Sequence, residues 1–251
     1  MRPHHELSGP PGAPVVVLGN SLGTTTALWD PQVAELRERF RVLRYDHRGH
    51  GGSPAAPGPY RVADLGGDVL ELLDDLGVER FSYCGVSLGA MVGMWLAGHA
   101  PERVDRLVLC CTTADYPDPR PWRERAATVR RSGTASIAAQ VVGRWFTPAL
   151  RARSPEVVAA FEAMVSEVDD EGYAACCDAL AELDLRPVLP AITAPTAVVA
   201  GAQDEATPPD RLRAIAEAIP AAELFVVDGA AHLANVEAAD AVSAVLREHL
   251  R

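Results

Sequence analysis

The sequence contains no lysine, and all 23 of its basic residues are arginine. Without a lysine amine, the chain can neither form a Schiff base with a carbonyl substrate nor build a P-loop nucleotide site. Basic residues are also outnumbered by acidic ones, which leaves a formal net charge of −11. Because nucleic-acid binding depends on a cationic surface, this charge argues against a nucleic-acid partner.

Long apolar runs are missing too, so no segment is expected to cross a membrane. The N-terminal stretch MRPHHELSGPPG has no apolar signal core, and we therefore expect a cytoplasmic protein. The five cysteines include the adjacent pairs Cys110–Cys111 and Cys176–Cys177, which suit neither ordinary disulfides nor a zinc site. We expect all five to be small buried residues.

The pattern that is present is an alternation of strands and helices. Short β-branched or apolar runs predict strands at 14–18, 41–45, 81–84, 106–111, 196–200 and 224–227, with a possible edge strand at 4–7. Helical spacing of apolar residues separates them at 31–40, 62–76, 88–99, 209–219 and 238–249. This rhythm predicts an α/β fold with a doubly wound, mostly parallel sheet.

The alternation stops between residues 116 and 186, where the apolar periodicity is helical throughout. We therefore expect an all-helical cap at 116–186, inserted into one α/β core made of residues 1–115 and 187–251. At 251 residues, the chain is long enough for a single well-filled core with such an insertion.

The stretch FSYCGVSLGAMVGMWLAGH (81–99) carries the strongest functional signal, because a strand, a Gly-x-Ser-x-Gly turn and a helix follow one another. A serine on such a sharp strand-to-helix turn is exposed as a nucleophile, and its neighbours Gly85 and Gly89 must lack bulk. We expect Ser87 to be the nucleophile. The first turn of the helix would aim the Leu88 N–H at an oxyanion formed beside Ser87.

A serine nucleophile needs a base, and sites in parallel sheets lie at the carboxyl ends of the strands. Of seven histidines, His232 follows a late strand most closely, in the loop Asp228-Gly229-Ala230-Ala231-His232. His47 and His50 also follow a strand, but in a Gly-rich turn that we interpret as structural. His232 is therefore the predicted base.

The base in turn needs a carboxylate to orient it. Asp204 lies in the loop after the strand at 196–200, where it could reach the far nitrogen of the imidazole. Asp115, beyond the strand at 106–111, is the alternative, and it stays open at this point. Asp204 is the preferred acid.

The chain order Ser87, Asp204, His232 resembles that of α/β-hydrolases. The loop 19–23 (GNSLG), the turn 45–53 (YDHRGHGGS), the stretch 143–148 (GRWFTP) and the loop 229–235 (GAAHLAN) are similar to those of 3-oxoadipate enol-lactonases. The superfamily normally has His-Gly in the first of these loops to supply a second oxyanion N–H. Here the loop reads Gly19-Asn20-Ser21, so the resemblance implies that the Ser21 N–H takes that role, and it implies no metal or cofactor.

Charge gives a separate indication of the substrate. Residues 116–153 contain eight arginines against two carboxylates, Asp118 and Glu124, although the whole chain is acidic. A cationic segment over the site would attract a small anion, such as a lactone that carries a carboxylate. Arg144 and Trp145, in the stretch shared with the lactonases, are the predicted substrate contacts, and Trp145 could equally be part of the cap core.

The predicted function is therefore hydrolysis of 3-oxoadipate enol-lactone in aromatic catabolism. Three alternatives remain: a carboxylesterase, a carbon–carbon bond hydrolase of ring-fission products, and a ligand-binding protein without turnover. The expected partner is the small anionic lactone, with neither nucleic acid nor membrane, and the oligomeric state is left open.

Overall fold

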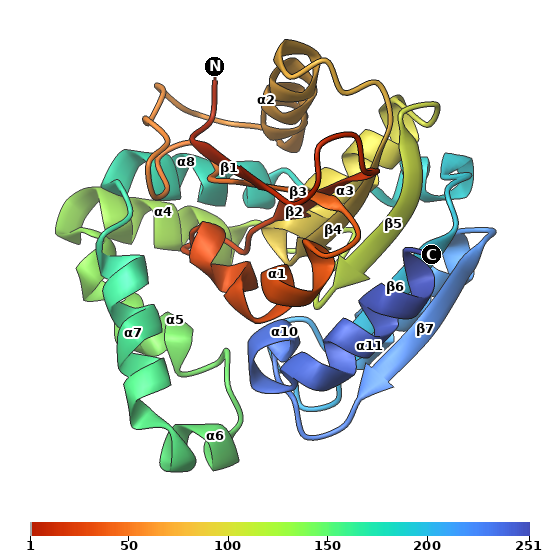
Figure 1. Ribbon diagram of the computed structural model, residues 1–251. Coiled ribbons are helices and arrows are strands. Elements are labelled where there is room, and N and C mark those ends of the chain that lie inside the picture. Colours follow the sequence, from red (N-terminus) through yellow and green to blue (C-terminus); the bar gives the residue numbers. More distant parts are fainter. Residues whose placement is uncertain (1) are drawn as a thin grey trace.

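The computed structural model describes residues 2–251. A seven-stranded sheet forms its centre, with the strand order β1-β3-β2-β4-β5-β6-β7 (Figure 1). The strands are β1 (His5–Ser8), β2 (Val15–Gly19), β3 (Arg41–Tyr45), β4 (Phe81–Val86), β5 (Val104–Cys110), β6 (Thr196–Gly201) and β7 (Ala222–Val227). Only β1 runs antiparallel to its neighbour, so the predicted mostly parallel sheet is confirmed.

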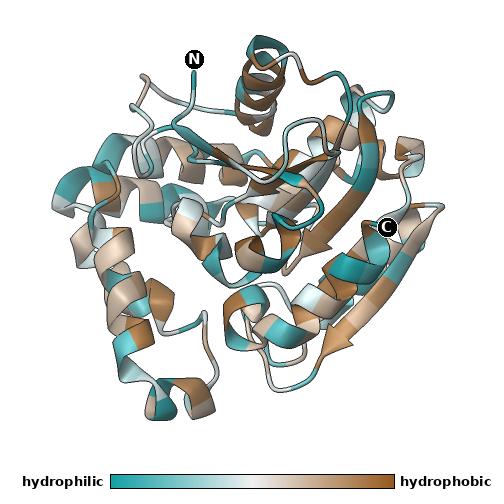
Figure 2. Ribbon diagram, viewed as in Figure 1, coloured by the Kyte–Doolittle hydropathy of each residue, from teal (hydrophilic) through white to brown (hydrophobic). Residues whose placement is uncertain are grey.

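Helices cover both faces of this sheet, as a doubly wound fold requires. The helices outside the insertion are α1 (Asp30–Leu36), α2 (Val62–Asp75), α3 (Leu88–His99), α9 (Pro209–Ala218), α10 (Ala234–Glu237) and α11 (Ala239–His249). On one face α1 packs against α11, and on the other α2 packs against α3. Figure 2 shows apolar residues along the strands and mixed hydropathy on the surrounding helices, in keeping with a core on both sides of the sheet.

Five α-helices lie between β5 and β6 in the chain, and Figure 1 shows them grouped to one side of the sheet. They are α4 (Arg120–Ser132), α5 (Ala138–Val142), α6 (Pro148–Arg153), α7 (Pro155–Ser166) and α8 (Asp170–Ala181). The two ends of this segment meet: Asp115 forms an antiparallel bridge with Asp184, and the Leu185 N–H donates to the Ala114 carbonyl. The segment therefore leaves and rejoins the core at one place.

The bounds of α1 differ from those of the helix predicted at 31–40. A 3₁₀ turn at Thr26–Trp29 already winds the chain, so Trp29 becomes the N-cap and Asp30 the first helical residue. The Asp30 carboxylate pairs with Arg44 on β3. The helix also ends at Leu36, earlier than expected, and turns continue to Phe40.

The five cysteines are all free and buried, which confirms their expected role as small core residues. No helix in the described part of the chain combines the length and the apolar character needed to cross a membrane.

Candidate active site

Ser87 lies between the end of β4 and the first turn of α3, with φ 54° and ψ −114°. This backbone conformation is strained for any residue with a side chain. Glycines allow it, because a Cβ on Gly85 would lie 2.3 Å from the Gly89 carbonyl carbon, and one on Gly89 would lie 2.3 Å from the Gly19 carbonyl. The strand, turn and α3 therefore converge on Ser87 as the sequence predicts.

His232 and Asp204 form a hydrogen-bonded pair 28 residues apart. His232 Nδ1 lies 2.8 Å from Asp204 Oδ2, and both side chains are almost completely buried. Because an ionised carboxylate only accepts, the imidazole carries its proton on Nδ1 and leaves Nε2 free to act as a base.

Three further donors hold the Asp204 carboxylate in place. Thr207 Oγ1 donates to Oδ2 over 2.6 Å, while the Ala206 and Thr207 N–H groups donate to Oδ1. Burial alone raises the pKa of Asp204, but attraction to His232 and the hydrogen bonds from His232 and Thr207 outweigh it and lower the pKa below its usual value. Asp204 is therefore ionised at neutral pH.

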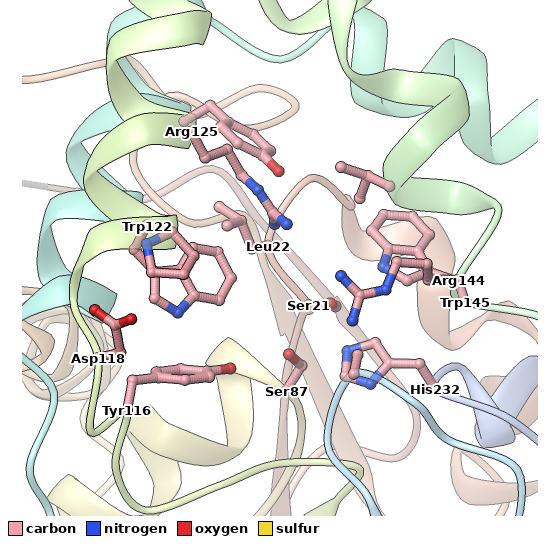
Figure 3. A pocket seen from close by; sticks show the side chains of 14 residues that line it. Ser21, Leu22, Ser87, Tyr116, Asp118, Trp122, Arg125, Arg144, Trp145 and His232 are labelled. Carbon is pink, nitrogen blue, oxygen red and sulfur yellow. The ribbon is translucent and has the colours of Figure 1, made fainter.

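Ser87 and His232 line the same cavity, and in Figure 3 the imidazole lies beside the serine hydroxyl. Within residues 2–251, no direct hydrogen bond joins the two side chains. Such bonds are often long in hydrolases without substrate and shorten when substrate binds.

Asp115, the alternative acid, has other partners. Its two carboxylate oxygens pair with Arg211 at 3.1 Å and with Arg186 at 3.3 Å. It borders a separate crevice beside α9 and does not line the cavity that holds Ser87 and His232. The geometry therefore favours Asp204 over Asp115 as the carboxylate that orients His232.

Two backbone N–H groups are available beside Ser87. Leu88 is the first residue of α3, so no helical carbonyl precedes its N–H. Ser21 lies in the loop after β2 and lines the cavity, and the Gly89 N–H donates to the Asn20 carbonyl over 2.9 Å, which brings that loop against the turn at Ser87. Both predicted oxyanion donors are thus next to the candidate nucleophile.

The cavity itself has a volume of about 310 Å³ and lies between the sheet edge and the inserted helices. It is lined by Ser21, Leu22, Ser87, Tyr116, Asp118, Pro121, Trp122, Arg125, Val141, Arg144, Trp145, Tyr173, Ala206 and His232. This size suits a small molecule of about a dozen heavy atoms.

Five of the eight arginines in residues 116–153 fall into two groups. Three form surface ion pairs: Arg120 with Asp118, Arg123 with Glu182, and Arg130 with both Glu171 and Asp178. Arg125 and Arg144, in contrast, line the cavity, and neither forms an ion pair with a carboxylate within the described residues. The Arg144 guanidinium donates a long hydrogen bond of 3.5 Å to the Glu205 backbone carbonyl, so neither charge is neutralised by a carboxylate of the described residues.

Arg144 and Trp145, the predicted substrate contacts, both line the cavity. Trp145 is only 5% exposed and packs edge-to-face on Phe161, with ring centroids 6.1 Å apart. It is thus a core residue of the inserted helices and a wall of the cavity at once.

Four further residues line the cavity but were not predicted as site residues from the sequence: Tyr116, Trp122, Arg125 and Tyr173. Arg125 follows Trp122 by three residues on α4 and lies over its ring, 4.5 Å from the centroid. Figure 3 shows the Arg125 guanidinium and the Tyr116 hydroxyl pointing into the cavity. The i, i+3 spacing of an aromatic residue and an arginine is the signal that could have identified this pair.

The described residues contain no group of three or more His, Cys, Asp or Glu side chains arranged to hold a metal ion.

Comparison with known proteins places this arrangement in a family. Residues 14–239 match the family model of the alpha/beta hydrolase fold. Two relatives come from Acinetobacter baylyi. The first, 3-oxoadipate enol-lactonase 2, is 41% identical over 89% of this chain and 84% of its own length. The second, 3-oxoadipate enol-lactonase 1, is 33% identical over 92% of this chain and 86% of its own length. The crystal structure of the enol-lactonase from Burkholderia xenovorans LB400 is 41% identical and superposes with a TM-score of 0.96, covering 98% of this chain and 95% of that one. The chain therefore belongs to the α/β-hydrolase family, and its predicted resemblance to 3-oxoadipate enol-lactonases is confirmed.

Proposed function

We propose that this protein hydrolyses 3-oxoadipate enol-lactone to 3-oxoadipate. The observation that carries the proposal is that two guanidinium groups, those of Arg125 and Arg144, line the cavity that holds Ser87 and His232 and form no ion pair with a carboxylate of the described residues. A neutral ester would not need them, whereas a lactone that carries a carboxylate would gain a charge-assisted hydrogen bond. The likeness to enol-lactonases of other bacteria supports the same substrate.

In the first half of the reaction, His232 Nε2 takes the hydroxyl proton of Ser87 while Oγ attacks the lactone carbonyl carbon. The N–H groups of Leu88 and Ser21 stabilise the resulting oxyanion, by about 3–4 kcal/mol for each donor. The ring C–O bond then breaks, and the enol oxygen leaves with the electron pair and takes up the proton from His232. The released enol stays attached, because it is part of the same molecule as the acyl group.

In the second half, His232 removes a proton from water, and the hydroxide attacks the acyl carbon. The tetrahedral intermediate collapses and breaks the bond to Ser87 Oγ, which regains its proton. An enolate is a good leaving group, so protonation by His232 contributes less here than it does in amide hydrolysis. Each turnover consumes one water and creates one new carboxylate, and it therefore releases one proton to the solvent at neutral pH.

We further propose that residues 116–186 act as a cap on a core formed by residues 1–115 and 187–251, of which residue 1 lies outside the described part of the chain. The bridge between Asp115 and Asp184 closes the base of this segment, and Trp122, Arg125, Arg144 and Trp145 from it reach the cavity. The core would then supply the reacting groups and the cap the substrate contacts.

The test is turnover of authentic enol-lactone, followed by proton release, by the wild-type protein and by Ser87→Ala. We expect turnover in the wild type and its loss in the variant. Parallel assays with a neutral p-nitrophenyl ester and a ring-fission diketone separate the alternative enzymes. A higher kcat/KM for the ester or the diketone than for the enol-lactone would overturn the assignment. Binding of the lactone without turnover would identify a ligand-binding protein.

A further inference from the structure

Two buried histidines from the turn after β3 hold the loop that carries Ser21. His47 is 2% exposed and His50 is not exposed at all. His47 Nε2 lies 2.9 Å from the Asn20 carbonyl oxygen, and the Gly23 N–H donates to His50 Nε2 over 3.1 Å. The loop is therefore bound at both of its ends by imidazole rings that the proposed reaction does not use.

The contact with His47 bears directly on the oxyanion donor. The carbonyl of Asn20 and the N–H of Ser21 belong to the same planar trans peptide, so they point in opposite directions. That carbonyl accepts two hydrogen bonds, one from His47 Nε2–H and one from the Gly89 N–H. Holding the Asn20 carbonyl in place therefore also sets the direction of the Ser21 N–H. In addition, hydrogen bonds accepted by the carbonyl polarise the peptide and make its N–H a stronger donor.

We propose that His47 is a positioning residue of the oxyanion hole, which orients and polarises the peptide between Asn20 and Ser21. This inference rests on the proposed function, because it assumes that Ser21 donates to an oxyanion. His47 itself does not reach the cavity and does not touch the reacting atoms.

The hydrogen bonding of the two rings requires opposite tautomers. Since a carbonyl only accepts, His47 carries its proton on Nε2. His50 Nδ1 lies 2.9 Å from the Arg48 carbonyl, so His50 carries its proton on Nδ1 and presents a bare Nε2 to Gly23. Burial lowers the pKa of both rings, that of His47 to about 3, and this keeps both neutral at the pH of the cell.

A purely structural role does not explain the choice of histidine at position 47. Its Nδ1 is buried and has no hydrogen-bond partner among the described residues, which costs free energy that an apolar side chain would avoid. Among the described residues, the Asn20 carbonyl is the one hydrogen-bond partner of the ring. The hydrogen bond of this buried ring is therefore made to the peptide that carries the Ser21 N–H.

The test compares His47→Gln with His47→Asn, two amides that differ by one methylene in reach. The glutamine amide can occupy the position of Nε2 and donate to the Asn20 carbonyl, whereas the asparagine amide reaches only the position of Nδ1. His47→Leu removes the donor altogether, and His99→Leu, on the exposed side of α3, is the matched histidine control. All are assayed with p-nitrophenyl acetate and with a neutral p-nitrophenyl phosphonate that phosphonylates Ser87, whose endpoint counts the active sites.

We expect kcat per active site to fall about 10-fold or more in His47→Asn and His47→Leu, with KM within about 2-fold, since oxyanion contacts act in the transition state. The rate of phosphonylation should fall by a similar factor, while His47→Gln stays within about 3-fold of wild type and His99→Leu is unchanged. A structural role alone would lower the number of active sites or the Tm and leave kcat per site unaltered, and that result would overturn the proposal. If His47→Leu does not fold, the comparison of His47→Gln with His47→Asn still tests the role of His47.

These outcomes are separate from those of the proposed function. If the wild type fails to hydrolyse the enol-lactone but His47→Asn slows both p-nitrophenyl reactions, the substrate assignment fails and the role of His47 stands. If the lactone is hydrolysed and His47→Asn is as fast as His47→Gln, only the role of His47 fails.

Discussion

Glu237 joins the loop that carries His232 to the inserted helices, through Thr147. The Glu237 carboxylate accepts hydrogen bonds from the Thr147 N–H at 3.1 Å and from the Thr147 hydroxyl, and it also accepts one from the Ala231 N–H at 2.9 Å. Thr147 is the N-cap of α6, and Ala231 directly precedes His232. A second contact, from the Leu233 N–H to the Trp145 carbonyl, lies beside the first. The position of His232 is therefore coupled to that of the cavity wall.

Replacing Glu237 by alanine should disturb both sides of this contact. Three donors would lose their acceptor, at a cost of about 2–3 kcal/mol, which corresponds to a fall in Tm of roughly 5–10 °C for a chain of this size. We also expect kcat to fall, because His232 loses its support. Thermal unfolding and steady-state kinetics measure the two effects. Glu237→Gln is the control, since its amide oxygen can still accept, and it should lose less than half as much stability. Equal losses in the two variants would contradict this role.

Arg125 and Arg144 should be distinguishable from the other cap arginines by kinetics. Replacing either by alanine removes a charge-assisted hydrogen bond to the substrate carboxylate, so KM for the enol-lactone should rise about 10- to 100-fold. A neutral p-nitrophenyl ester lacks the carboxylate, and its KM should change by less than about 2-fold. Arg123→Ala, which removes a surface pair with Glu182, is the matched control and should behave like wild type. An unchanged KM for the lactone in Arg144→Ala would exclude that residue as a contact.

Ser87 should be a site where stability and activity oppose one another. Its positive φ costs about 1–3 kcal/mol, and a glycine adopts this conformation without strain but is more flexible when unfolded. We therefore expect Ser87→Gly to be about 1 kcal/mol more stable than Ser87→Ala, although both lack the nucleophile and are inactive. Urea unfolding of the two variants isolates the backbone contribution, because they differ only by Cβ. Stability of Ser87→Gly equal to or below that of Ser87→Ala would show that the turn is unstrained.

The buried neutral His47 predicts a pH-dependent stability. Burial lowers its pKa in the folded protein to about 3, while in the unfolded chain it stays near 6.5. As pH falls from 6.5 towards 3, the unfolded chain takes up a proton that folded His47 does not, so stability is lost by up to about 1.4 kcal/mol per pH unit. His47→Gln cannot titrate, and its unfolding free energy should fall less steeply over this range. Urea titrations at pH 7, 6, 5 and 4 measure the slopes, and identical slopes in the two proteins would contradict the assignment.

Much of the site was predictable because its residues follow strands. The Gly-x-Ser-x-Gly turn, the loop at 228–232 and the loop at 201–208 each come directly after a short apolar run. In a parallel sheet such loops meet at one edge, so Ser87, His232 and Asp204 could be named before their contacts were known. The choice between Asp204 and Asp115 could not be made in this way, because both follow strands. It depended on Arg186 and Arg211, which pair with Asp115.

The amino-acid sequence by itself determined the alternation of strands and helices, the helical insertion, the strained serine turn and the excess of arginine near it, since each is a local pattern of composition or spacing. Only the tertiary structure decided that Arg125 and Arg144 face the cavity while Arg120, Arg123 and Arg130 pair at the surface. It likewise decided that His47 supports the peptide before Ser21 and that Glu237 supports the loop before His232. The physical reason is that packing between segments far apart in the chain sets how each helix is rotated about its own axis and which loops meet. No local periodicity of the sequence encodes that packing.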